Sequence, residues 1–227
     1  MKKIILILFL SVGFTSAQEF TVEKISGVVK VLKGISEKWE TVKRGEVLSL
    51  NDVLLTEANS YIQLNKDENR FMLKGDVAIG LNHIKQVSIN DLLLALALDE
   101  IRNVPKIKRN SVYKNTAVYG SKSKVENKIN NDKNYLGTKK LNGAKLLNES
   151  GYSESSVIVA KEVFRNYPKI SMKFEDRLYF ADILNKLELY QESSSEYTKL
   201  ENIALSDEEK NTIEKRIESV SMKLVNQ

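Results

Sequence analysis

The 227-residue sequence contains no cysteine, a single histidine and only two prolines. Without cysteine, the chain can form neither disulfides nor thiolate metal sites, and it cannot be lipidated at a cysteine. A Ser-His-Asp triad could be assembled only around His83, which lies in the strand-rich stretch Leu81-Asn82-His83-Ile84. We therefore expect a structural or surface role for His83 and no metal cluster of histidine and cysteine.

Glycine-rich phosphate loops of the Walker or dinucleotide type are also missing from the sequence. Carboxylate runs such as Asp67-Glu68 and Asp207-Glu208-Glu209 fall in turns or at a helix start, where they cap or are solvated. A glycosidase that uses two distant carboxylates stays an open alternative. The sequence predicts a protein that is not an enzyme and that needs no cofactor and no metal.

The first 17 residues have the three parts of a secretory signal peptide. Lys2 and Lys3 supply a basic start, residues 4–10 are apolar, and Thr15-Ser16-Ala17 offers small residues for cleavage before Gln18. The apolar run is too short to cross a hydrocarbon core, which needs about 20 apolar residues. We expect an exported protein, periplasmic or extracellular, with no transmembrane segment after cleavage.

Charge is distributed unevenly along the rest of the chain. Residues 18–99 carry 10 basic and 12 acidic side chains, residues 100–140 carry 11 and 3, and residues 141–227 carry 12 and 15. One strongly basic segment therefore separates two mildly acidic blocks. This asymmetry predicts two domains and a connector.

The first block is a series of short β-rich runs with turn residues between them. The expected strands are 28–32, 39–42, 53–56, 61–64, 71–73 and 77–79. Gly27, Gly45 and Gly75 are expected where the backbone needs positive φ or a close approach, and Asn51 can do similar work. Strands at this spacing predict an all-β sandwich or barrel.

Several irregular positions in this block follow a family pattern. They are Gly27-x-Val29-x-Val31, Trp39, Gly45-x-x-Leu48, Asp52-x-Leu54-x-Thr56 and Ser60-x-Ile62-x-Leu64. The pattern, over about residues 18–90, resembles a FecR-like domain, with Asn51 where that family usually has glycine. Residues 116–121 are similar to a later strand of the family. The resemblance implies a periplasmic signalling regulator or an exported protein of another role; the signalling form needs a cytoplasmic segment and a membrane helix, and we find neither in this sequence.

A predicted helix closes the first block, with Asn90 as its N-cap and Pro105 as its stop. Its residues 91–98 are apolar nearly all round, which predicts a helix buried against one of the domains or covered by a partner. The following basic segment is interpreted as a solvated linker. Alternatively, Lys106, Lys108 and Arg109 contact an anionic surface, either lipid or a cell-wall polymer. Its few tyrosines do not favour nucleic acid.

The C-terminal block contains an internal repeat. An offset of 38 places Gly151-Tyr152 over Leu189-Tyr190, Gly143 over Ala181 and Leu146 over Leu184. Recurring small, apolar and aromatic positions predict stacked helical hairpins. A capping box at Ser206-x-x-Glu209 starts a last helix that covers the stack.

This repeat resembles the tetratricopeptide repeat. In that family the first helix of each hairpin lines a groove that binds proteins. The resemblance therefore nominates four residues of the first helices for partner contact, namely Asn148, Asp182, Asn185 and Lys186.

The domain plan and the function follow from these observations. We expect a signal peptide at 1–17, a β domain with a trailing helix at 18–99, a basic linker or β-domain extension at 100–137, and a helical domain at 138–227. The fold class is α+β in two domains. The leading hypothesis is an exported, non-catalytic adaptor for an envelope protein or peptide. The alternative is a protein that binds a cell-wall polymer or polysaccharide through the basic segment.

Overall fold

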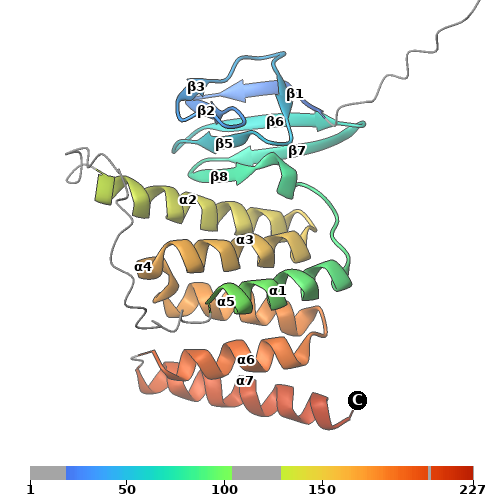
Figure 1. Ribbon diagram of the computed structural model, residues 1–227, viewed down its shortest axis with the longest axis vertical. Helices are drawn as coiled ribbons and strands as arrows, with labels where there is room; N and C mark the ends of the chain where they lie inside the picture. The colour runs from blue at the N-terminus through green and yellow to red at the C-terminus, as the bar shows by residue number, and fades with distance from the viewer. Residues whose placement is uncertain (1–18, 104–128, 204–205, 227) are drawn as a thin grey trace, which may run out of the picture.

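The computed structural model describes residues 19–103, 129–203 and 206–226, and it places β-strands before helices along the chain (Figure 1). The strands are β1 (Glu19–Ser26), β2 (Val29–Leu32), β3 (Trp39–Thr41), β4 (Val47–Ser49), β5 (Val53–Thr56), β6 (Tyr61–Lys66), β7 (Asn69–Lys74) and β8 (Val77–Gly80). The helices are the 3-10 turn η1 (Leu81–His83), α1 (Ile89–Asn103), α2 (Ile129–Glu149), α3 (Ser153–Asn166), α4 (Pro168–Ser171), α5 (Phe174–Lys186), α6 (Tyr190–Glu201) and α7 (Asp207–Val225). The α+β layout in two parts is therefore confirmed.

The strands form two four-stranded antiparallel sheets, with the orders β4-β1-β6-β7 and β3-β2-β5-β8. Side chains alternate across each strand, so that Phe20 and Val22 of β1 are buried while Thr21 between them is exposed. The inward residues of both sheets, among them Leu54 and Leu64, make one apolar core. All six expected strands are present, and β1 and β4 complete the two sheets.

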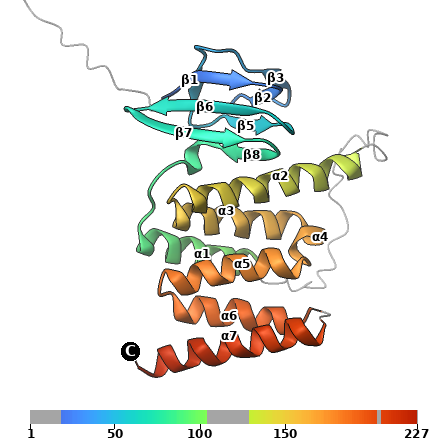
Figure 2. The ribbon, with the colours of Figure 1, turned by 180° about the vertical axis from the view of Figure 1, so that it is seen from behind.

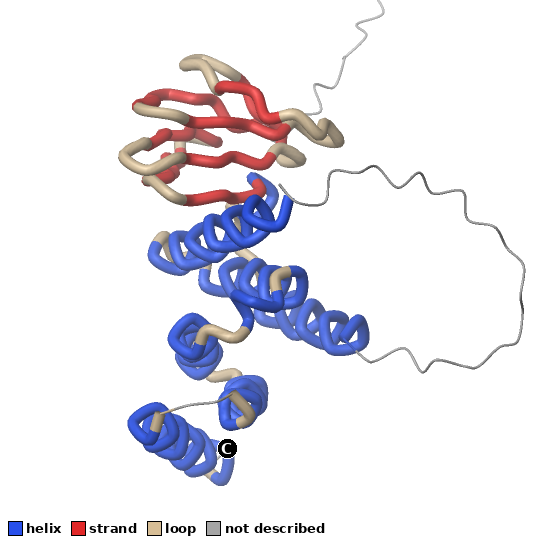
Figure 3. The backbone as a smooth tube through the Cα atoms, turned by 90° about the vertical axis from the view of Figure 1, so that its left-hand side faces the viewer, coloured by secondary structure: helices blue, strands red, loops and turns tan. Residues whose placement is uncertain are grey.

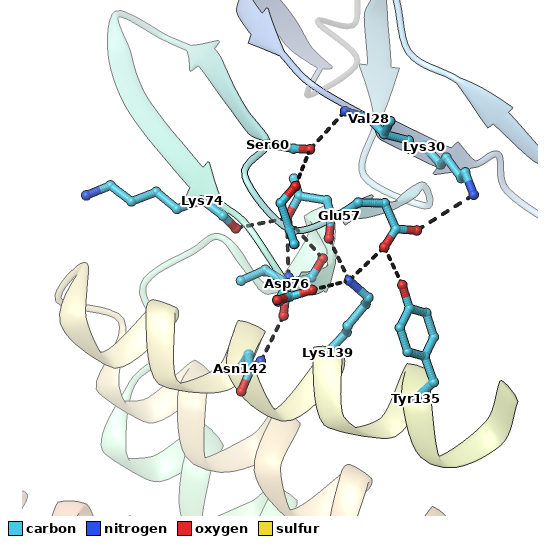
Figure 4. Close-up of polar contacts among 12 residues, drawn as sticks. Val28, Lys30, Glu57, Ser60, Lys74, Asp76, Tyr135, Lys139 and Asn142 are labelled. Atoms are coloured by element: carbon cyan, nitrogen blue, oxygen red, sulfur yellow. Dashed lines mark hydrogen bonds and ion pairs between the residues drawn. The ribbon is translucent and has the colours of Figure 1, made fainter. Parts of the chain in front are cut away.

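Close packing between two turns explains Gly27, one of the glycines of the family pattern described above. Gly27 has φ of 72°, and a Cβ there would lie 2.4 Å from Ser60 Oγ. That hydroxyl accepts a hydrogen bond from the Val28 amide at 2.8 Å (Figure 4). Gly45 also has positive φ, as expected. Asn51 does not adopt positive φ, so the expectation for Asn51 is wrong; the left-handed conformation falls instead on neighbouring turns, for example at Asn59.

The polar residues of the same pattern also hold turns. Asp52, which is 6% exposed, accepts hydrogen bonds from the Gly34 amide and from the Ser49 amide. Thr56 accepts one from the Val77 amide and donates one to the Lys74 carbonyl. Since buried polar groups need partners, these residues are explained by the sandwich itself.

The helices stack as two hairpins, α2–α3 and α5–α6, and α7 covers the last one (Figure 2). Seen along the helices, they lie in two columns, with α2, α5 and α7 in one and α3 and α6 in the other (Figure 3). The short helix α4 occupies the connection between the hairpins. The capping box of Ser206 and Glu209 is present at the start of α7, as expected.

The hairpins repeat with an offset of 37 residues, so the expected offset of 38 is wrong. Ser156 Oγ donates to the Ala144 carbonyl at 2.6 Å, and Ser193 Oγ donates to the Ala181 carbonyl at 3.2 Å. The residues of positive φ after α2 and α5, Gly151 and Glu188, differ by the same number. Similar residues at neighbouring positions produced the false match, and hydrogen bonding decides the register.

The corrected register gives Gly143 a different role. Ala144, and not Gly143, is the counterpart of Ala181. Gly143 faces β8 so closely that a Cβ would lie 2.3 Å from the Ala78 carbonyl oxygen. Its counterpart Phe180 packs edge-on against Phe164 of the preceding hairpin, with ring centroids 5.9 Å apart. The sandwich therefore occupies the place of a preceding hairpin and caps the stack.

A buried lysine joins the sandwich to α2 (Figure 4). Lys139 is 2% exposed, and its Nζ lies 2.8 Å from Asp76 Oδ1, 3.1 Å from Glu57 Oε2 and 3.0 Å from the Thr56 carbonyl. Burial acts to lower the pKa of Lys139, but its hydrogen bonds, first that to Asp76, outweigh burial and raise the pKa. Asn142, one turn along, donates to the Asp76 carbonyl. The two parts of the protein thus share an interface with polar groups satisfied.

Helix α1 runs beside α3, in the column away from α2 (Figure 3). Ser88 caps it, because Ser88 Oγ accepts from the Asp91 amide at 3.1 Å; the expected N-cap, Asn90, lies inside the helix. Leu96 is buried against the stack, whereas Leu94 is 61% exposed. The helix therefore packs against one of the domains, as expected, and leaves its other face exposed.

The connector is shorter than expected, because α2 already begins at Ile129. The expected linker of residues 100–137 therefore includes the last turn of α1 and the first turns of α2. The strand expected at residues 116–121 lies outside the described residues.

Candidate functional site

Three of the four nominated groove residues are engaged with neighbouring helices. Asn148 Nδ2 donates to the Tyr179 hydroxyl at 2.9 Å. Asp182 accepts from the Tyr197 hydroxyl at 2.5 Å and from Arg216 of α7. The polar groups of this face therefore tie one helix to the next.

The remaining nominated residues are placed as follows. Asn185 Oδ1 accepts from Lys223 Nζ at 3.0 Å, and Lys186 is exposed at the end of α5. The nominated anionic-surface residues, Lys106, Lys108 and Arg109, lie outside the described residues.

His83 lies in the 3-10 turn η1 rather than in a strand. It borders a cavity of about 300 Å³ between the sandwich and the helical stack, together with Lys140 and Glu162. Burial lowers the pKa of His83, although the charge of Glu162 opposes this. A largely buried histidine with a lowered pKa is neutral at pH 7.

A cavity of about 540 Å³ opens between the helices of the stack. It lies where α1, α3, α4, α5 and α6 meet, and we call it the charged chamber. Its lining residues are Asp99, Glu100, Lys161, Phe164, Arg165, Ser171, Arg177, Glu196 and Lys199. Four cations and three carboxylates thus surround one space, which is an unusual density of charge for a helical junction.

Helix periodicity brings these groups together. Lys161 and Arg165 are four residues apart on α3, and Glu196 and Lys199 are three apart on α6, so each pair shares a helix face. Arg177 enters from the first turns of α5, at the level of α4. The end of α1 adds two carboxylates as the outer wall.

Glu196 is the centre of the charged chamber. Lys161 Nζ and Lys199 Nζ lie 2.6 and 2.8 Å from its Oε1, and Arg177 Nη2 donates to its Oε2 at 3.1 Å. Burial acts to raise the pKa of Glu196, but Lys161 first and then Lys199 lower it to about 2. Burial lowers the pKa of Lys161 despite the attraction of Glu196. The Glu196 carboxylate therefore stays ionised well below neutral pH.

Arg177 has a donor that the protein leaves unused. Its Nε is buried and has no hydrogen-bond partner among the described residues. Its guanidinium carbon lies 5.9 Å from the centre of the Phe164 ring, which supports the side chain from one side. A buried donor without a partner costs about 1–3 kcal/mol, so a ligand acceptor or water at this point would stabilise the site.

Helix α1 closes the chamber through ion pairs. Arg165 contacts Asp99, and Lys199 lies 3.7 Å from Glu100, whose side chain is 69% exposed. The second pair is long and exposed, so its contribution is small. The wall made by α1 is therefore held more firmly at Asp99 than at its outer end.

The chemistry of the charged chamber suits binding. Its fixed donors and acceptors complement polar backbone groups and carboxylates, and Phe164 adds an apolar surface. Among residues 19–103, 129–203 and 206–226, no cluster of three or more histidine, cysteine or acidic side chains could hold a metal ion. Sequence reasoning missed the site because its charges are up to a hundred residues apart. The one local signal was that Glu196 lies a turn away from both Ser193 and Leu200, which are buried residues of α6.

Within the described part of the chain, no helix has both the length and the apolar character needed to span a bilayer. Comparisons of the chain with protein-family models, with curated proteins and with solved structures found no match.

Proposed function

We propose that this chain is an exported, non-catalytic adaptor that holds a segment of an envelope protein or peptide in the charged chamber. One observation carries the proposal: seven charged side chains from four helices converge on a cavity of about 540 Å³. Cavities of this size with a few convergent polar groups are the usual form of a binding site. The resemblances to FecR-like domains and to tetratricopeptide repeats favour the same class of protein.

The charges define the kind of segment that fits. Cations outnumber carboxylates in the lining, and the unused donor of Arg177 also calls for an acceptor. A carboxylate on the bound segment would complement the excess of cations and could also accept from Arg177 Nε. An amide carbonyl could accept from Arg177 Nε alone. The sandwich supports binding by the stack, because the ion pairs of Lys139 hold one end of the stack in place.

The test is mild crosslinking in cells of the full-length protein with a C-terminal tag, followed by identification of what it captures by mass spectrometry. The variant Lys199→Glu reverses a half-exposed cation at the mouth of the charged chamber. The matched control, Lys186→Glu, makes the same change at an exposed position on the opposite column, in the groove that the sequence nominated. We expect a small set of envelope proteins whose capture falls at least about tenfold in Lys199→Glu and persists in Lys186→Glu.

The opposite pattern, with capture lost only in Lys186→Glu, would move the binding site to the groove. A substrate that the pure mature protein turns over, with activity abolished by a point change, would overturn the non-catalytic assignment.

Export has its own test. The intact mass of the mature protein should correspond to a chain that begins at Gln18.

A further inference from the structure

Another cavity lies on the sandwich, beside the junction with α2. It has a volume of about 290 Å³, and we call it the tryptophan cleft. Its lining residues are Lys30, Trp39, Leu55, Glu57, Tyr135 and Leu136. None of these residues lines the charged chamber, so a ligand can occupy either site without contacting the other.

Two aromatic rings and two leucines supply the apolar part of this cleft. Trp39 starts β3, the outer strand of its sheet, and is the only tryptophan of the chain. Tyr135 comes from α2 and is 46% exposed. Leu55 of β5 and Leu136 of α2 also line the cleft. Strands and a helix that are far apart in the sequence thus make one apolar concave surface.

The polar part is the Glu57 carboxylate, with one oxygen held by hydrogen bonds and the other in an ion pair with Lys30 (Figure 4). Glu57 Oε2 accepts from the Tyr135 hydroxyl and from Lys139 Nζ. Glu57 Oε1 lies 3.7 Å from Lys30 Nζ, which is longer than a hydrogen bond. The hydrogen bond from Tyr135 leads the groups that lower the pKa of Glu57, so the carboxylate stays ionised and accepting at neutral pH.

The mixture of charges narrows the class of ligand. A strongly anionic ligand would meet Glu57, and a strongly cationic one would meet Lys30 and the nearby Lys139. A neutral ligand with adjacent donors and acceptors satisfies both sides, because hydroxyl groups can donate to Glu57 Oε1 and accept from Lys30 Nζ. The aromatic faces then suit a flat apolar face on the same ligand.

We propose that the tryptophan cleft binds a pyranose ring of a neutral glycan. A pyranose combines the two required features, since its C–H groups form an apolar face and its hydroxyls lie around the rim. The volume is near the lower end of the range of about 300–1,000 Å³ for small-ligand sites, which suits one or two sugar rings. The site places glycan recognition on the sandwich rather than on the basic connector.

Trp39 provides the readout, because it is the only tryptophan and lines the cleft. The mature full-length protein is titrated with a trisaccharide of glucose, with a trisaccharide of N-acetylglucosamine and, separately, with a neutral tripeptide. We expect a saturable change in Trp39 emission with at least one trisaccharide and none with the tripeptide. Binding by the tripeptide alone, or no response to either trisaccharide up to about 10 mM, would overturn the proposal.

Variants locate the binding by calorimetry. Lys30→Met removes the donor from a half-exposed position and should weaken the affinity about tenfold. Trp39→Phe should weaken it similarly, and its far-UV circular dichroism shows whether it folds. Lys24→Met, an exposed lysine of β1 outside the cleft, is the matched control and should bind as the parent does. Equal affinity of the parent and Lys30→Met would refute this site. The capture experiment with Lys199→Glu is unaffected by either result.

Discussion

Lys139 and Glu196 are charged side chains that are both 6% exposed or less, and each is held by several partners. Lys139 joins two parts of the protein across the interface, whereas Glu196 gathers cations at the edge of a cavity. A buried charge is tolerated only when hydrogen bonds and opposite charges replace water. At the scale of the residue, the partners therefore distinguish a charge that joins the two parts of the protein from one that lines a cavity.

Glu196 makes stability depend on acid pH. Its pKa in the folded protein is about 2, below its ordinary 4.5, so its contribution is full above pH 4.5 and is lost as the pH falls toward 2. The contribution is on the order of 3 kcal/mol, less what the burial of Lys161 costs. We expect Glu196→Gln to lower the free energy of unfolding at pH 7 by about 2–3 kcal/mol and to flatten its pH dependence between 5 and 2.

Urea unfolding at a series of pH values measures this effect. Glu100→Gln removes a carboxylate from the same chamber at a largely exposed position and is the matched control. An unchanged pH dependence in Glu196→Gln would show that the three cations do not hold this carboxylate as described.

At the scale of the element, α2 differs from the other helices because one of its faces meets a sheet. The interface requires a residue without a side chain at Gly143, where the β8 backbone approaches. Its counterpart in the next hairpin is Phe180, which fills the wider space between two helices. The two hairpins therefore share a hydrogen-bond pattern but differ at the position that touches the preceding layer.

Gly143→Ala tests this contact. Alanine in a helix interior usually stabilises by about 0.5–1 kcal/mol relative to glycine. Here the new Cβ would lie 2.3 Å from the Ala78 carbonyl oxygen, so α2 and β8 must separate. We expect a net loss of about 1–3 kcal/mol in the free energy of unfolding, measured with urea. Thr138→Ala, at an exposed position of the same helix, is the control for helix propensity; a more stable Gly143→Ala protein would contradict the close approach.

At the scale of the whole molecule, we expect the sandwich and the helical stack to unfold as one unit. Apolar residues of the sandwich and of α1 to α5 form one cluster from Phe20 to Leu184, and Lys139 bridges the boundary; a second cluster joins α5 to α6 and α7. Small hairpin stacks need caps at both ends, and here the sandwich and α7 supply them. The shared interface means that neither part should unfold first.

Two probes distinguish the parts in one urea titration. Trp39 emission reports the sandwich, because the chain has no other tryptophan, and circular dichroism at the helix band reports the stack. We expect the two transitions to coincide in the parent protein. In Lys139→Met they should separate, because the interface loses the hydrogen bonds and ion pairs of Lys139. Separate transitions in the parent would contradict the single unit. Lys140→Met, which alters a neighbouring lysine that is 29% exposed, should leave them together.

Local patterns predicted the elements well. Alternation and turn residues gave the strands around Val31, Leu54 and Ile62, and spacing of apolar residues gave the helices of the C-terminal block. The register of the repeat was missed by one residue because small residues occupy both Gly143 and Ala144. The N-cap of α1 was missed because Ser88 and Asn90 are both good caps, and the position of the first turn decides between them.

By itself, the amino-acid sequence determined the order of β and α parts, the turns that need Gly27 and the basic character of the connector, because these depend on neighbours along the chain. Tertiary structure alone decided that the sandwich caps the helical stack and that α1 walls a cavity. It also decided that Glu196 meets three cations and that Trp39 shares a cleft with Tyr135. Both sites join residues far apart in the sequence, and only packing determines which distant side chains meet.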